Sequence, residues 1–236
     1  MIPLRDANPT RRAPIITLLL IGLCFVVFAY ELGILADSGE EGLNRFFLQY
    51  GVVPHDVTAA FDKGDLASPA ILAIFTSMFL HGGWVHILGN MLYLWIFGNN
   101  VEDRLGRIPF LLFYFVGGVA AAVTQIEIDP TSSAPLVGAS GAIAAALGAY
   151  LVLYPGARIL SLVFLGFFYQ LIEVPALVVL GFWFILQLID GLGSLGGSNA
   201  QGGVAFFAHV GGFVLGVIVG LLIRGRGSGP RLAAVG

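Results

Sequence analysis

Six long apolar runs constrain this chain more than any other feature of its sequence. A helix that crosses a bilayer needs roughly 20 consecutive apolar residues, and stretches free of Asp, Glu, Lys and Arg recur along the chain. Hydrophobic residues make up 58% of the chain and charged residues 11%, with a mean hydropathy of +0.93. The sequence therefore predicts an all-α membrane protein with six spanning helices, over residues 14–35, 84–101, 108–126, 138–154, 174–190 and 204–223.

The distribution of charge tests this topology independently, because basic residues favour the cytoplasmic side of a membrane. With a cytoplasmic N-terminus, nine of the 11 Lys and Arg residues fall inside, and only Arg45 and Lys63 fall outside. Acidic residues fall mainly outside. We therefore expect six spans with both termini in the cytoplasm.

The rest of the chain is divided around these spans. Residues 1–13 are expected to be a cytoplasmic N-terminal segment, 14–223 the six-helix domain and 224–236 a short basic cytoplasmic tail. The first span is not expected to be a cleaved signal peptide, since no small-residue cleavage site follows it. Segments 36–83 outside and 156–172 inside carry apolar stretches too short to span, which predicts interfacial positions.

Polar residues inside a membrane are costly and point to function. Five stand out here, namely His81, His86, Asn90, Ser140 and His209. The last four fall near the outer ends of their helices, within roughly 3–9 Å of the helix starts at about 1.5 Å per residue. The topology thus predicts one shared depth in the outer half of the bilayer.

Ser140 and His209 have the chemistry of a nucleophile and its base. A serine hydroxyl is a weak nucleophile and needs an adjacent base, and His209 is the histidine that another helix offers at that depth. Ser140 follows Gly138 at a predicted helix start, where free backbone N–H groups can stabilise an oxyanion. Taken alone, Ser140 could be a small residue at a helix contact, and His209 could make a structural hydrogen bond.

Glycines stand where these two helices would meet. Gly212 and Gly216 share a helix face with His209 and form a small-xxx-small pattern, which lets helices approach closely. The helix predicted over 138–154 also carries small residues, beginning with Gly141, that allow such an approach. Close packing and a serine–histidine hydrogen bond require the same approach.

His86 and Asn90 lie four residues apart, on one helix face. Both can donate hydrogen bonds to a developing negative charge, and the alternative is a local polar network. His81, which precedes the span, is expected to brace the loop.

These residues together resemble the rhomboid family of intramembrane serine proteases. The matching pieces cover about residues 14–223 and are His81-x4-His86-x3-Asn90, Glu102-Asp103-Arg104-Leu105-Gly106, Gly138-Ala139-Ser140-Gly141 and Ala208-His209-x2-Gly212-x3-Gly216. Each piece is weak alone, but their order and spacing are specific.

The resemblance implies a six-helix fold around a water-filled cavity open to the outside. It implies a Ser140–His209 dyad, with His86, Asn90 and the Ser140 backbone N–H as the oxyanion hole. Segment 36–83 would be the membrane-embedded first loop. The helix over 174–190 and the loop Gly191–Gly203 would be a mobile gate and cap.

The family pattern also includes supporting residues, and this chain differs from that pattern at one position. Glu102 and Arg104 match a structural pair. The family often has an aromatic residue four positions after the serine, stacked against the histidine, and here that position is Ala144. Another aromatic side chain is therefore expected to take its place, or His209 is held less rigidly.

Four other functions fit the sequence less well. A non-catalytic rhomboid-like protein that binds membrane clients would lack the serine or the histidine, and both are present. A transporter would more often show a repeat or broken helices. A zinc intramembrane protease would need His-Glu-x-x-His, and a soluble-type hydrolase Gly-x-Ser-x-Gly; both motifs are absent from the sequence.

The expected activity is therefore serine endopeptidase cleavage of single-span membrane proteins near the outer face. No cofactor or metal is expected, no nucleic-acid partner, and no requirement for an oligomer. The lipid bilayer is the other expected partner. A prokaryotic plasma membrane is the expected location.

Overall fold

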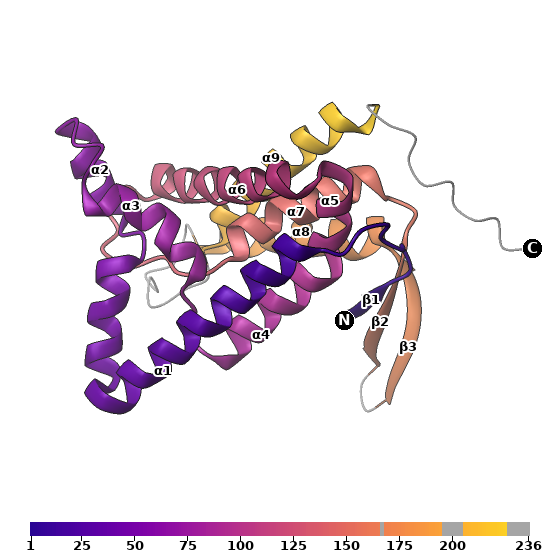
Figure 1. Cartoon of the computed structure of the whole chain (residues 1–236), viewed down its shortest axis with the longest axis horizontal. Helices are drawn as coiled ribbons and strands as arrows, with labels where there is room; N and C mark the ends of the chain where they lie inside the picture. Colours follow the sequence, from indigo (N-terminus) through magenta and orange to yellow (C-terminus); the bar gives the residue numbers. More distant parts are fainter. Residues whose placement is uncertain (166–167, 195–204, 226–236) are drawn as a thin grey trace, which may run out of the picture.

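The computed structural model describes residues 1–165, 168–194 and 205–225. A helical bundle forms the body of the molecule, and a small sheet lies at one end (Figure 1). The elements in chain order are β1 (Ile2–Asp6), α1 (Ile15–Tyr50), α2 (Pro54–Asp62), α3 (Pro69–Thr76), the 3-10 turn η1 (Ser77–Phe79), α4 (Trp84–Tyr93), the π-helical turn η2 (Leu94–Gly98), α5 (Asn99–Leu105), α6 (Arg107–Ile128), α7 (Ser140–Leu153), β2 (Arg158–Leu165), β3 (Phe168–Pro175), α8 (Ala176–Ser194) and α9 (Phe206–Arg224).

The predicted six-helix membrane bundle is confirmed. The six predicted spans correspond to the first limb of α1, the continuous α4–η2–α5 segment, α6, α7, α8 and α9. By length and composition, four described helices can cross a membrane alone, and α3–η1 with α4–α5 forms a bent pair that can supply a fifth. The chain is thus a multi-pass integral membrane protein.

Helix α7 is shorter than the prediction and lies at the centre of the bundle. It has 14 residues, about 21 Å of helix at 1.5 Å per residue, against a hydrocarbon core of about 30 Å. Every residue from Gly141 to Tyr150 is buried. Protein therefore surrounds this stretch of α7, whereas the longer helices keep exposed apolar faces. The length of α7 need not match the thickness of the bilayer.

Helix α1 differs most from the predicted boundaries. It turns at Gly39, whose φ of 64° lies in the left-handed region that favours glycine. A second limb then continues to Tyr50, so the predicted outer loop over 36–83 contains helical structure throughout much of its length. Figure 1 shows the two limbs of α1 meeting at a sharp corner.

The sheet at the end of the bundle was not predicted. Residues 158–165 and 168–175 form the antiparallel strand pair of β2 and β3, called the hairpin below, and β1 adds to β2 in the order β1-β2-β3. The segment is rich in the β-branched and aromatic residues that favour strands, and Pro155 and Pro175 bound it. An all-α description of this chain is therefore incomplete.

Carboxylates on α5 hold the start of α1. Glu102, which is buried, accepts hydrogen bonds from the backbone N–H groups of Ile16 (3.0 Å) and Thr17 (2.8 Å). It also accepts one from the Thr17 hydroxyl at 2.8 Å. The first N–H groups of a helix have no intrahelical partner, so this side chain satisfies them and places a negative charge at the positive helix end.

Replacing Glu102 tests this cap. We expect Glu102→Gln to lower the free energy of unfolding by about 2 kcal/mol, because it removes charged hydrogen bonds at a buried site. The measurement is chemical unfolding in detergent followed by circular dichroism. Glu41→Gln is the control, since Glu41 is exposed and forms an exposed ion pair with Arg45 four residues along the helix. Equal effects of the two substitutions would contradict the cap.

Candidate active site

Ser140 and His209 come from different helices and meet directly. Ser140 is the first residue of α7, and His209 lies in the first turn of α9. The Ser140 Oγ and the His209 Nε2 are 2.8 Å apart, and His209 is only 8% exposed. The structure thus brings together the two residues that the sequence placed at one depth.

The helix boundary at Ser140 corrects the predicted start at Gly138. Gly138 has a φ of 129°, outside the helical region, and its N–H donates to the Ser77 carbonyl at 2.9 Å. The first α-helical bond of this segment runs from the Ile143 N–H to the Ala139 carbonyl. The N–H groups of Ser140 and Gly141 therefore precede the intrahelical ladder and remain available to a ligand.

Backbone-to-backbone contact between α7 and α9 sets this meeting. A Cβ atom added to Gly212 would collide with the Gly141 carbonyl, and one added to Gly216 would collide with the Ala145 carbonyl. A Cβ on Gly141 itself would lie 2.5 Å from the Ala121 side chain of α6. The glycines that the sequence singled out therefore stand at the closest approach of three helices.

The second nitrogen of the His209 ring has a partner that the sequence analysis missed. The His209 Nδ1 lies 2.6 Å from the Gln187 Oε1 of α8. A carbonyl oxygen can only accept, so Nδ1 carries the proton, and Nε2 presents its lone pair to the Ser140 hydroxyl. Gln187 is the one polar residue in the apolar run 174–189, which is the signal that could have identified it.

An aromatic ring from α8 lies beside His209. The Trp183 ring centroid is 5.8 Å from that of His209, with the planes tilted by 41°. Ala144, the position where an aromatic residue was expected, is fully buried, and a Cβ on Gly212 would lie 3.4 Å from its methyl group. Position 144 is thus a small residue enclosed by its neighbours, and the aromatic contact to His209 comes from α8 instead.

His86 and Asn90 of α4 face the residues just before Ser140. A Cβ added to Gly138 would lie 2.7 Å from the His86 Nε2 and 3.6 Å from the Asn90 Nδ2. The Gly82 N–H donates to the His86 Nδ1 at 3.3 Å, so Nε2 carries the proton of the neutral ring. The Asn90 amide nitrogen is buried and has no hydrogen-bond partner among the described residues. Two donors thus converge beside the Ser140 backbone.

Comparison with known proteins identifies the family of this chain. The family description "Rhomboid domain" matches residues 69–226 of this chain. The chain belongs to the rhomboid family. It is 29% identical over 222 residues to the Rhomboid protease GluP of Bacillus subtilis, which covers 94% of this chain and 38% of that protein.

Other rhomboid relatives match over shorter stretches. Rhomboid protein 1, mitochondrial, of Saccharomyces cerevisiae is 30% identical over 156 residues, which is 64% of this chain and 42% of that protein. The Putative rhomboid protease YdcA of Bacillus subtilis is 34% identical over 100 residues, or 42% of this chain and 49% of that protein. The chain thus spans less than half the length of each of these relatives.

The remaining predicted residues support this cluster, and the His81 ring contacts the His86 ring edge-on at a centroid distance of 5.2 Å. The His81 N–H donates to both Glu31 carboxyl oxygens, at 3.1 and 3.3 Å, and its Nδ1 lies 3.1 Å from the Phe79 carbonyl. Arg104 donates to the carbonyls of Ile223 (2.9 Å) and Arg224 (3.3 Å) at the end of α9. His81 therefore holds the loop before α4, and Arg104 ties α5 to α9.

Two further sequence-based expectations concern metals and the cap. Among residues 1–165, 168–194 and 205–225, no group of three His, Cys, Asp or Glu side chains is placed to hold a metal ion. The predicted cap loop Gly191–Gly203 lies mostly outside the described residues, since α8 ends at Ser194.

Substitution at Gly212 tests whether the α7–α9 contact sets the site. We expect Gly212→Ala to lower the free energy of unfolding by about 1–3 kcal/mol, because the added methyl group overpacks a backbone contact. Reaction of Ser140 with a fluorophosphonate should fall with it, since α9 must move away from α7. The measurements are detergent unfolding and labelling rate.

Gly181→Ala on α8 is the matched control, because a Cβ there meets nothing within 4 Å. It should leave both quantities near those of the unaltered chain. A Gly212→Ala protein that behaves like Gly181→Ala would show that the glycine contact is not needed.

Proposed function

We propose that this rhomboid protein is an intramembrane serine endopeptidase, with Ser140 as nucleophile and His209 as general base. The observation that carries the proposal is the 2.8 Å contact between the Ser140 Oγ and the His209 Nε2. Proximity of a hydroxyl and an imidazole in the correct tautomer is what activates a serine. The relatives named as rhomboid proteases support it.

The reaction follows from the orientation of the two side chains. His209 takes the hydroxyl proton through Nε2 as the Ser140 Oγ attacks a peptide carbonyl carbon. The tetrahedral intermediate collapses, the C–N bond breaks, and the protonated His209 gives its proton to the leaving amine. Water, deprotonated by His209, then attacks the acyl carbon. The bond between that carbon and the Ser140 Oγ breaks, His209 returns the proton to Oγ, and the second product leaves as a carboxylic acid.

The negative charge on the oxygen of the tetrahedral intermediate would lie next to hydrogen-bond donors of α4 and α7. The Ser140 backbone N–H, the His86 Nε2–H and the Asn90 amide form the proposed oxyanion hole. A buried amide nitrogen with no described partner is costly in the resting protein, and an oxyanion would satisfy it. Donors that are fixed before the reaction stabilise developing charge without reorganisation.

The proposed substrates are single-span membrane proteins, cut near the outer face of the membrane. Ser140, His209 and His86 all lie near the N-terminal ends of their helices, and these ends lie together at one end of the bundle. The charge distribution favours the opposite end as cytoplasmic, with both termini there. On this reading residues 1–13 and 224–236 flank a protease domain over 14–223, in a prokaryotic plasma membrane.

A rhomboid-like protein that binds membrane clients without cutting them is the second candidate. Such a protein has no need for a serine and a histidine in hydrogen-bond contact. The further contact between His209 and Gln187, which sets the base-competent tautomer, also favours the enzyme.

Cleavage in reconstituted vesicles tests the proposal. The chain is expected to cut a single-span reporter. Both Ser140→Ala and His209→Ala should lower the cleavage rate at least about 10³-fold, as the loss of a nucleophile or a base does. Ser133→Ala is the matched control, since Ser133 is exposed in the loop before α7. Cleavage that survives Ser140→Ala would refute the proposal, whereas an intact chain that binds the reporter without cutting it would support the client-binding alternative.

Gln187 provides a prediction about the orientation of the base. Gln187→Met keeps the side-chain length but removes the acceptor. We therefore expect kcat to fall about 10-fold with KM unchanged, a change that corresponds to the loss of one hydrogen bond. Gln187→Glu retains an acceptor oxygen and should restore most of kcat. Leu186→Met, at the neighbouring exposed position of α8, is the control. Equal rates for Gln187→Met and Gln187→Glu would contradict the role of the acceptor.

A further inference from the structure

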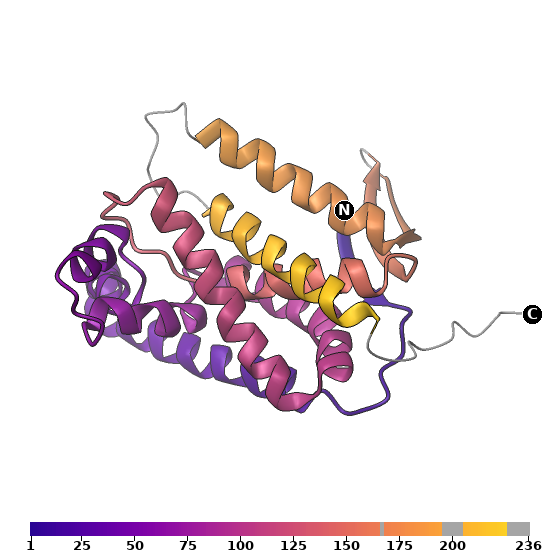
Figure 2. The ribbon, with the colours of Figure 1, turned by 90° about the horizontal axis from the view of Figure 1, so that it is seen from above.

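The hairpin formed by β2 and β3 (residues 158–175) is a feature that catalysis does not use. It lies at the end of the bundle where α1 begins and α9 ends, away from Ser140. In Figure 1 it runs across the direction of the long helices, and in Figure 2 it again lies at that end of the bundle. A strand pair placed in this way runs along the plane of a membrane that the helices cross.

The base of the hairpin is fixed to the bundle. The Asp6 carboxylate on β1 accepts hydrogen bonds from the Tyr150 hydroxyl (2.8 Å) and the Asn100 amide (2.7 Å). Ile159 and Ser161 of β2 are fully buried. Because these contacts hold the sheet at both β1 and β2, its orientation relative to the helices is set.

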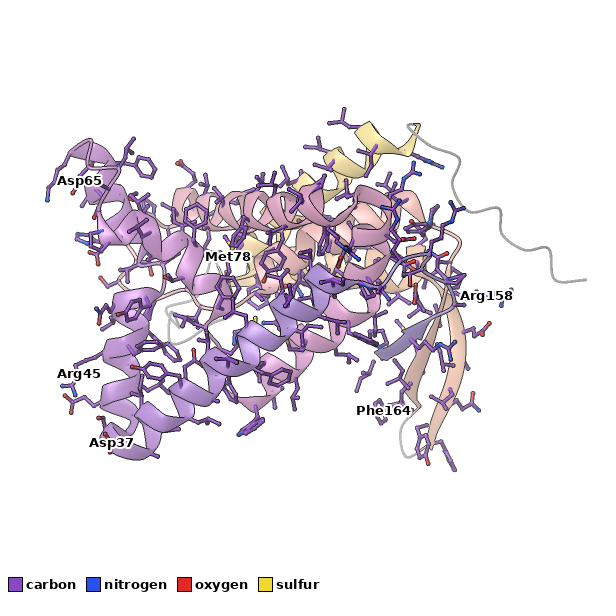
Figure 3. All side chains as sticks on the ribbon, viewed as in Figure 1. Asp37, Arg45, Asp65, Met78, Arg158 and Phe164 are labelled. Atoms are coloured by element: carbon purple, nitrogen blue, oxygen red, sulfur yellow. The ribbon has the colours of Figure 1, made fainter. Side chains whose placement is uncertain are left out.

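The outer part of the hairpin is apolar and exposed. Phe168 is 77% exposed and Tyr169 70%, and Phe164, Leu171 and Ile172 are exposed as well. Figure 3 shows Phe164 far along the strand from Arg158 at its base. The sequence has no charged residue between Arg158 and Glu173, and these two side chains form an ion pair at 3.5 Å. In water, such an apolar strand pair would favour aggregation.

The backbone limits how deep this hairpin can lie. β3 is an edge strand of the described sheet, so one row of its N–H and C=O groups lacks strand partners. Such groups are too costly for the hydrocarbon core but can bond to water and headgroups at the interface. Aromatic residues such as those near the turn are typical of that level of the membrane.

The charges around the base of the hairpin fit the same depth. Arginines lie in or next to the elements at this end of the bundle, where basic groups could meet lipid phosphates; they are Arg5, Arg11, Arg12, Arg104, Arg107, Arg158 and Arg224. We propose that the hairpin is a membrane-surface anchor, lying in the headgroup region of the leaflet at the arginine-rich end. Phe164 and Tyr169, which pair across the two strands and so share one face of the sheet, lie among the upper acyl chains. This inference does not depend on the proposed protease activity.

Spin labels in vesicles test the anchor on the full chain. Phe164→Cys and Tyr169→Cys, which lie on the same face of the sheet, would each be labelled with a nitroxide and reconstituted in phosphatidylcholine–phosphatidylglycerol vesicles. Glu173→Cys, at the base of the same strand, is the matched control. The native Cys24 is buried, so the unaltered chain should take up no label, and unfolding curves should show that the variants keep the fold.

The readout is collision of the label with lipid-soluble oxygen and with a water-soluble nickel complex. We expect both tip positions to favour oxygen over nickel several-fold more than Glu173→Cys does. Tip labels as accessible to nickel as the control would overturn the anchor. Spin–spin broadening that grows with the protein-to-lipid ratio would overturn it too, because it would show that a second copy covers the edge of β3.

Discussion

The backbone contact between α7 and α9 is the constraint on which the rest of this structure depends. With no side chain at Gly212 and Gly216, α9 lies directly against the carbonyl groups of α7. At that separation a serine at the start of one helix and a histidine in the first turn of the other reach hydrogen-bond distance. The aromatic neighbour of His209 comes from α8, whereas position 144 on α7 is a buried alanine. Packing and chemistry are therefore one requirement in this bundle.

Helix α8 contributes both of the contacts that hold the histidine ring from the far side. Gln187 sets its tautomer, and Trp183 lies beside it. Otherwise α8 is largely exposed along its length, and Figure 2 shows it on the outside of the bundle. The orientation of the proposed base therefore depends on the position of an outer helix. Any movement of α8 away from α9 would therefore weaken the contact with Gln187 first.

The membrane spans and the two central site residues could be predicted from the sequence. Long apolar runs report spans directly, because lipid imposes a minimum length on them. Polar residues inside those runs, Ser140 and His209 among them, stand out since burial makes them costly. Gln187 met the same criterion but was overlooked within the run 174–189. The hairpin over 158–175 could not be separated from an interfacial helix, because a short apolar segment has no periodicity that distinguishes the two.

Mapping the site of covalent modification tests the central claim most directly. The chain, reconstituted in vesicles, would be treated with a fluorophosphonate and its peptides analysed by mass spectrometry. We expect a single adduct on Ser140, formed much more slowly when His209 is replaced by alanine, because the hydroxyl proton then has no base to accept it. An adduct on a different residue, or one that forms on Ser140 at the same rate without His209, would contradict it.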